Sequence, residues 1–157
     1  MIQLYFFCWQ EISGKYRNLL KYGLMWHQLP ERRAYMEAKQ GKVLICDDSL
    51  LVRKKLKDIL TSIGCEVFEA RNGKEAFQVY QTSRPDLVFM DIVMPDTDGL
   101  EALKNLKAFD DQANVIMLSS LGTSDKLIQA LKYGASDFIQ KPYTVEQITQ
   151  IVAKIAK

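Results

Sequence analysis

From Gly41 onward, short apolar runs alternate with longer segments whose apolar residues recur every three or four positions. The short runs predict β-strands buried on both faces, and the longer segments predict amphipathic helices. The predicted strands are residues 42–46, 65–70, 87–90, 114–118 and 137–140. The predicted helices are residues 50–63, 74–82, 100–109, 124–133 and 145–156. This alternation indicates an α/β domain in which right-handed crossovers place helices on both faces of a parallel sheet.

Residues with capping and turn chemistry mark the ends of these elements. Ser49 and Thr144 precede predicted helices and can accept hydrogen bonds from their first N–H groups. Gly64 and Gly134 follow predicted helices, where glycine commonly ends the last turn. Within the first helix, Leu51 belongs to the recurring apolar set, so we expect it to face the core.

The charge of the chain is unevenly distributed. Residues 1–40 contain 6 Lys and Arg against 3 Asp and Glu, and residues 41–157 contain 15 against 16. The net charge of +2 therefore comes from the front segment, and it gives little reason to expect nucleic-acid binding. The apolar run at residues 1–9 is too short to span a membrane, so we expect no membrane insertion.

The composition limits the chemistry that the chain can carry. A length of 157 residues, 48% of them hydrophobic and 25% charged, is typical of one globular domain. His27 is the only histidine, which excludes a His-based triad or a His-rich metal site. Cys46 and Cys65 lie in apolar runs without a CxxC pair, so we expect reduced core thiols and a cytoplasmic protein.

Residues 1–40 form an N-terminal extension that we separate from the domain at residues 41–157. The sequence Glu31-Arg32-Arg33 can be encoded by a purine-rich ribosome-binding sequence, and it ends shortly before Met36. We therefore expect Met36 to be the natural start and residues 1–35 to be translated upstream DNA. The alternative is a genuine but poorly ordered N-terminal arm.

Chemical groups stand at four of the predicted strand ends. Asp47 and Asp48 follow the first strand, Asp91 the third, Ser119 the fourth and Lys141 the fifth. The carboxyl ends of parallel strands point the same way, so these side chains can converge. Carboxylates that lie close together demand a cation, and all-oxygen ligands select a hard ion such as Mg²⁺. With a hydroxyl and an ammonium beside it, such a site can move a phosphoryl group onto a carboxylate.

These residues resemble the receiver domain of two-component response regulators over residues 42–157. The motif set is Asp-Asp, then Asp…Met-Pro-x-x-Asp-Gly, then Ser, then Lys-Pro at the strand ends. The stretch 114–143 looks most like the chemotaxis regulators of Gram-positive bacteria. The resemblance implies a flavodoxin-like (βα)5 fold, doubly wound, with a parallel five-stranded sheet of order 2-1-3-4-5. The Lys141–Pro142 dipeptide also suggests a cis peptide bond.

The resemblance implies a metal and a phosphoacceptor. Asp91 would accept the phosphoryl group. Asp47 and Asp48 would hold Mg²⁺ together with Asp91 and the backbone carbonyl of Val93, with the more direct bond from Asp48.

The resemblance also implies a switch. Ser119 would contact a phosphoryl oxygen and Lys141 would pair with the phosphoryl group. Phe138 occupies the aromatic position that would turn inward when Ser119 moves. Two simpler interpretations stay open: Phe138 could be an ordinary core residue, and Ser119 could merely cap a strand.

The function implied is that of a single-domain response regulator that is activated by phosphorylation. A sensor histidine kinase would supply the phosphoryl group, and the output would be binding, in chemotaxis to the flagellar motor switch protein. We expect no enzyme activity beyond Mg²⁺-dependent autophosphorylation and slow self-dephosphorylation, so that a separate phosphatase would be a further partner. The alternatives are a phosphorelay intermediate that passes the phosphoryl group to a phosphotransfer protein, and an inert receiver-like binding module.

Overall fold

Five strands and five helices alternate along the described chain. The computed structural model describes residues 41–94, 98–120 and 124–155. Its strands are β1 (Lys42–Cys46), β2 (Glu66–Ala70), β3 (Leu87–Asp91), β4 (Val115–Ser119) and β5 (Asp137–Gln140). Its helices are α3 (Leu50–Ser62), α4 (Gly73–Ser83), α5 (Gly99–Phe109), α6 (Ser124–Lys132) and α7 (Val145–Ile155). Every predicted element is present, and no boundary differs from its prediction by more than one residue.

The strands form one parallel sheet in the order β2-β1-β3-β4-β5, as the family resemblance implied. All residues of β3 and β4 are buried. Unbroken apolar runs are expected for strands that are covered on both faces, and the strand order puts β3 in the middle of the sheet. Residue 91 therefore stands at the carboxyl end of the central strand.

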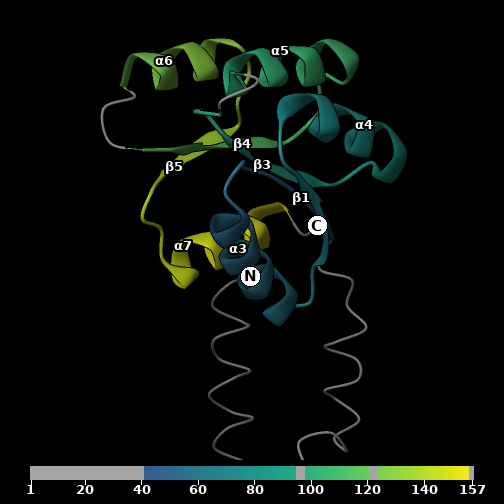
Figure 1. Ribbon diagram of the computed structural model, residues 1–157, viewed down its shortest axis with the longest axis vertical. Helices are drawn as coiled ribbons and strands as arrows, with labels where there is room; N and C mark the ends of the chain where they lie inside the picture. The colour runs from purple at the N-terminus through teal and green to yellow at the C-terminus, as the bar shows by residue number, and fades with distance from the viewer. Residues whose placement is uncertain (1–40, 95–97, 121–123, 156–157) are drawn as a thin grey trace, which may run out of the picture. The chain divides into compact units, whose positions relative to one another are not determined.

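Helices cover both faces of the sheet, with α4, α5 and α6 on one side and α3 and α7 on the other (Figure 1). Successive residues of a strand point to opposite faces, so each strand contributes to two cores. Leu44 packs in the core with residues of α4, α5 and α6. Ile45 packs in the core with residues of α3 and α7. The two cores together fix the strands whose ends carry the site.

Two of the candidate site residues, Asp91 and Ser119, lie inside strands, not after them as predicted. Asp91 pairs in register with Leu118, and Ser119 pairs with Gln140. The hydrogen-bond ladder continues past Asp91, because the Ile92 N–H donates to the Leu118 carbonyl at 3.0 Å. These two side chains are consequently held by the sheet itself.

The inward face of α3 differs from the prediction at two positions. Leu51, expected in the core, is 78% exposed, whereas Arg53 is only 6% exposed. The buried positions of this helix include Arg53, Leu56 and Leu60, which follow helical spacing. Leu51 precedes Arg53 by two residues, which is about 200° around the helix axis, and it therefore faces outward.

The predicted helix ends are confirmed. The Ser49 hydroxyl accepts the Val52 N–H at 3.5 Å, and the Thr144 hydroxyl accepts the Gln147 N–H at 3.2 Å. Gly134 has a φ of +91°, in the left-handed region that glycine adopts without strain. The Lys141–Pro142 peptide bond is cis, and Cys46 and Cys65 are buried in the core, both as predicted.

Candidate functional site

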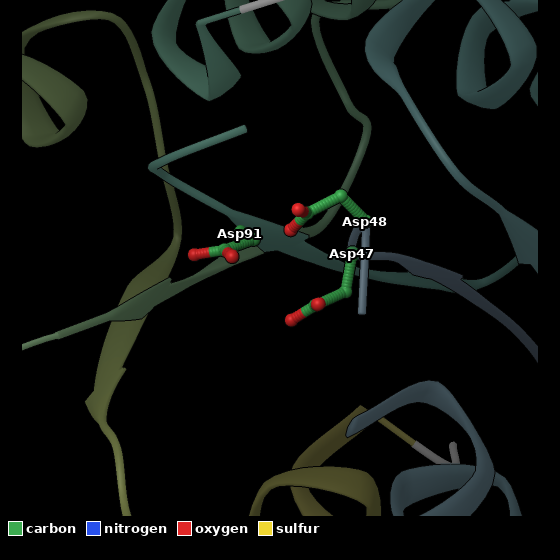
Figure 2. Close-up of side chains that lie close together, drawn as sticks. All are labelled: Asp47, Asp48 and Asp91. Carbon is green, nitrogen blue, oxygen red and sulfur yellow. The ribbon is translucent and has the colours of Figure 1, made fainter. Parts of the chain in front are cut away.

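Three carboxylates meet at the carboxyl ends of β1 and β3. Asp47, Asp48 and Asp91 each offer an oxygen, and these atoms all lie within 4.8 Å of one another. The three side chains extend to the same side of the strand ends (Figure 2). Asp47 and Asp91 are 1% and 5% exposed, while Asp48 is open to solvent. The convergence expected from the sequence is therefore present, with one acid at the surface and two beneath it.

Asp47 is fixed on three sides. Its backbone N–H donates to the Ala70 carbonyl of β2 at 3.2 Å. Its Oδ1 accepts the Ser49 N–H at 2.9 Å, and its Oδ2 accepts a hydrogen bond from Lys141 Nζ at 2.6 Å. The carboxylate is thus oriented by the turn that leads into α3 and by the residue that follows β5.

Lys141 bridges two of the acids. Its Nζ lies 2.6 Å from Asp47 Oδ2 and 3.0 Å from Asp91 Oδ2. Burial disfavours the charged amine, but the hydrogen bonds and charges of Asp47 and Asp91 outweigh it and raise the pKa of Lys141 above its ordinary value. The ammonium therefore stays charged at neutral pH, where an incoming anion would meet it.

The surroundings of Asp91 oppose its ionisation. Burial raises the pKa of Asp91 above its ordinary value, although the hydrogen bond and charge of Lys141 act in the opposite direction. The charge of Asp47 raises it further, and the Val93 N–H, which donates to Oδ1 at 3.3 Å, lowers it. A cation that joined the cluster would relieve this cost of ionising Asp91.

The donor set fits Mg²⁺. Three carboxylates beside one ammonium leave two negative charges uncompensated, and a divalent ion balances them. Each carboxylate oxygen keeps a lone pair beyond the bonds described above. Hard, oxygen-only ligands with one side open to water suit Mg²⁺, which retains several water ligands. Asp47, Asp48 and Asp91 are the residues that would hold the ion; the predicted fourth ligand, the Val93 carbonyl, stays a prediction.

The two predicted switch residues lie on neighbouring strands. Ser119 is 1% exposed, and its hydroxyl donates to the Ile139 carbonyl of β5 at 3.4 Å. Phe138, next to Ile139, is 43% exposed. The interpretation of Phe138 as a core residue is therefore wrong, because a core side chain would be almost fully buried. In this structure the Ser119 hydroxyl is engaged with β5 and not with the acid cluster.

Three further residues support the site: Arg53 was missed from the sequence, whereas Asp98 and Gly99 were recognised only as part of the Met-Pro-x-x-Asp-Gly motif. Asp98 caps α5 by accepting the Leu100 N–H at 3.0 Å, and Arg53 donates to the carbonyls of Asp47 and Asp48. A Cβ atom on Gly99 would lie 1.9 Å from the carbonyl oxygen of Asp91, so only glycine fits there. Arg53 could have been found from its spacing, because it precedes the core residue Leu56 by three positions. The close approach at Gly99 has no local signature, because it depends on how α5 packs against β3.

Within the described residues, no helix is long and apolar enough to cross a lipid bilayer.

Comparison with known proteins gives a consistent result. The sequence model of the response regulator receiver domain matches residues 43–153. The chain is 44% identical to the chemotaxis protein CheY of Bacillus subtilis over 114 residues, which are 72% of this chain and 95% of that protein. It is 34% identical to the sporulation initiation phosphotransferase F of Bacillus subtilis over 113 residues, which are 72% of this chain and 91% of that protein.

A solved structure shows the same architecture. The crystal structure of the receiver domain of NtrX from Brucella abortus superposes with a TM-score of 0.69 at 28% sequence identity. The match covers 73% of this chain and 97% of that domain.

Proposed function

The chain belongs to the response regulator receiver domain family, and from this premise we propose that Asp91 is its phosphoacceptor and Mg²⁺ its cofactor. Receiver domains are phosphoacceptors. The observation that carries the assignment is the position of Lys141 Nζ, 3.0 Å from Asp91 Oδ2 at the end of the central strand. Asp47 contacts the same ammonium, so this ion pair alone does not separate the two acids. Asp91 differs in ending the central strand and in opening the Asp…Met-Pro-x-x-Asp-Gly motif, and the loop that follows it is open to solvent at Val93, which is 51% exposed.

The transfer is a substitution at phosphorus. An oxygen of Asp91 forms a bond to the phosphorus atom, and the bond from phosphorus to a histidine nitrogen of the donor kinase breaks. The released electron pair stays on that nitrogen, and the product on the chain is an acyl phosphate. Mg²⁺, when bound, neutralises charge that develops on the phosphoryl oxygens. Lys141 leaves its bond to Asp91 and pairs with the phosphoryl group, and Ser119 donates its hydroxyl hydrogen to a phosphoryl oxygen.

The test of the phosphoacceptor is direct. The chain is incubated with acetyl phosphate and Mg²⁺, and the acyl phosphate is measured by intact-mass spectrometry. Asp91→Asn should abolish the modification, because the amide is not a nucleophile here. Asp58→Asn, an exposed position on α3, is the matched control and should be modified at the wild-type level. Full modification of Asp91→Asn would refute the assignment.

For the output we propose phosphorylation-dependent binding in chemotaxis. The 44% identity to the chemotaxis protein CheY supports this pathway. The partner surface would be the β5 edge, by which we mean the exposed apolar side chains of α6, β5 and α7. Its members are Ile128, Leu131, Phe138 and Val145. Large exposed apolar side chains on adjoining elements are typical of a protein-binding surface.

The route from the site to this edge runs through β4 and β5. The 3.4 Å bond from the Ser119 hydroxyl to the Ile139 carbonyl is long, so little is lost when Ser119 turns toward a phosphoryl group. Movement of Ser119 frees space beside β5, and Phe138 turns inward to fill it. The ligand at Asp91 can shift this equilibrium only by its different contacts with the two states.

A phosphorelay role is the second candidate, because the chain is 34% identical to a sporulation phosphotransferase. The two roles are separated by incubating the chain with a chemotaxis histidine kinase or a relay kinase of Bacillus subtilis. Retention of the phosphorylated chain by the flagellar motor switch protein supports chemotaxis. Transfer of the phosphoryl group onward to a phosphotransfer histidine supports the relay. A cytoplasmic location and the need for a separate phosphatase belong to the same proposal.

A further inference from the structure

Arg53 is a charged residue inside the core layer beneath the acid cluster. It is 6% exposed, and its Nη1 donates to the carbonyl oxygen of Asp47 at 2.8 Å and to that of Asp48 at 3.2 Å. A buried guanidinium is usually paired with a carboxylate. Here the Nε atom lies 3.6 Å from Glu69 Oε1 and has no hydrogen bond among the described residues. The strongest contacts of this buried cation are therefore made to the backbone of the acidic pair.

The side chain closes the turn between β1 and α3. The Arg53 backbone N–H donates to the Ser49 carbonyl at 3.0 Å, which forms the first turn of the helix. Its guanidinium folds back to the two carbonyls that precede Ser49. On the other side of the same turn, Asp47 Oδ1 accepts the Ser49 N–H at 2.9 Å. The backbone of residues 47–49 is thereby held from both ends. This also fixes the direction in which the side chains of Asp47 and Asp48 leave the backbone.

Arg53 bonds to the backbone carbonyls of Asp47 and Asp48 and not to their carboxylates, which affects how a metal ion can bind there. A cation bonded to the carboxylate oxygens competes with a metal ion for the same lone pairs, as Lys141 does at Asp47. Arg53 places its positive charge beside Asp47 and Asp48, where it lowers their mutual repulsion, and it leaves their carboxylate oxygens to the ion. Groups that orient metal ligands from outside the ligand set commonly change metal affinity by about 10- to 100-fold.

We infer that Arg53 is a positioning residue for the divalent-ion site: by clamping the carbonyls of Asp47 and Asp48 it presents both carboxylates to the metal. The inference rests on the proposed Mg²⁺ site. Arg53 touches neither the ion nor the reacting atoms, and it acts through the backbone of the turn.

Lys57 offers a matched control on the same helix. Its Nζ contacts Glu69 Oε2 at 2.6 Å, so Lys57 and Arg53 share one carboxylate of β2. Lys57→Met removes the same charge from α3 and the same partner from Glu69, but it leaves both carbonyl bonds intact. Because the Lys57 side chain is 46% exposed, its own ion pair contributes little to stability.

The experiment measures the Mg²⁺ dissociation constant of the full chain by isothermal titration calorimetry. Arg53→Met should weaken Mg²⁺ binding by about 10-fold or more, and Lys57→Met by less than about 2-fold. The conservative exchanges Arg53→Lys and Lys57→Arg form a second pair in case Arg53→Met does not fold. Arg53→Lys retains the charge but shortens the reach to the carbonyls, so it should weaken binding by about 3-fold or more, and Lys57→Arg should not. Denaturant unfolding without Mg²⁺ gives the stability of each variant separately.

Each outcome decides the inference. Weaker Mg²⁺ binding in the Arg53 variants alone, including in variants that remain fully folded, supports it. Equal losses in the Arg53 and Lys57 variants, or wild-type affinity in the folded Arg53 variant, overturn it. Asp48→Asn separates this inference from the proposed function. If the wild-type chain and Asp48→Asn bind Mg²⁺ equally, the metal site itself is wrong, whereas loss in Asp48→Asn with full binding in the Arg53 variants refutes only the role of Arg53.

Discussion

The acid cluster and the β5 edge lie on one domain but are built in opposite ways. At the cluster, Asp47 and Asp91 are nearly inaccessible and each carries bonds to Lys141 and to neighbouring backbone. At the β5 edge, Phe138 and Ile128 are 43% and 55% exposed. The proposed phosphoacceptor site needs atoms fixed by several contacts, whereas the proposed partner surface needs side chains that are free to move. Variants can test this division from the largest expected effect to the smallest.

The largest effect should follow the loss of a ligand from the cluster. Asp48→Ala removes the exposed carboxylate and should weaken Mg²⁺ binding by about 100-fold or more, beyond the usual effect of groups outside the ligand set. Asp47→Ala should weaken it less, because the family resemblance gives Asp48 the more direct bond. Isothermal titration calorimetry measures both, with Ile128→Ser at the β5 edge as the control. Unchanged affinity in both acidic variants would place the metal elsewhere.

The next largest effect should come from the close packing of Gly99 against the backbone of Asp91. Gly99→Ala would bring a Cβ to 1.9 Å from the Asp91 carbonyl oxygen, so α5 or the end of β3 must shift. We expect a loss of about 1–3 kcal/mol in the free energy of unfolding, the range typical of overpacking. Ile128→Ala, on the exposed side of α6, should change it by less than about 0.5 kcal/mol. Urea unfolding followed by far-UV circular dichroism measures both, and equal effects at the two positions would contradict the contrast.

The rate at which Asp91 loses the phosphoryl group should depend on the side chains at positions 93 and 121. Hydrolysis needs a water in line with phosphorus, and the side chain of Val93 cannot hydrogen-bond it. Leu121, the second residue of this prediction, lies outside the described residues. Val93→Asn combined with Leu121→Glu should speed self-dephosphorylation by about 10-fold, because it supplies groups that position the water. The decay of the acyl phosphate measures the rate; a wild-type half-life of seconds that the double substitution leaves unchanged would disprove this.

A smaller effect follows from the raised pKa of Asp91. A carboxyl group whose pKa is higher in the folded chain binds its proton more tightly when folded, so ionisation lowers stability as the pH rises above its unfolded value. Without Mg²⁺, Asp91→Asn should therefore raise the free energy of unfolding at pH 7, because it removes the cost of ionising a buried carboxyl group. The difference should shrink as the pH falls through the folded pKa of Asp91, and it should vanish below the ordinary value of 3.8, where the carboxyl group is protonated in both states. A variant that is less stable than the wild type at pH 7 would reverse the sign and contradict the prediction.

The smallest effect should come from the front of the chain. We propose that residues 1–35 are not needed by the domain at residues 41–157. A chain that begins at Met36 should unfold at the same denaturant concentration, bind Mg²⁺ equally and accept the phosphoryl group at the same rate. Comparison of the two chains by urea unfolding and calorimetry checks this. A large loss of stability on truncation would show that the segment supports the domain.

Much of the fold could be predicted from the sequence because its signals are local. Buried strands are unbroken apolar runs, helices show their own period, and capping residues such as Ser49 and Thr144 mark helix starts. The convergence of the candidate site residues could be predicted for a related reason. In a parallel sheet the carboxyl ends of the strands share one edge, so Asp91 and Lys141 had to come near each other. The cis bond before Pro142 was also accessible, because it depends on a dipeptide.

The sequence alone determined the alternation of elements, the strand ends that carry carboxylates, and the chemistry that those residue types allow. Helical spacing from Leu56 places Arg53 on the inward face of α3, but only the tertiary structure decided that its guanidinium bonds to the carbonyls of Asp47 and Asp48. It alone decided that Gly99 must lack a side chain and that Ser119 bonds to β5. The reason is physical: periodicity and capping depend on neighbours along the chain, whereas burial of a cation or contact between two backbones depends on segments that meet only after folding.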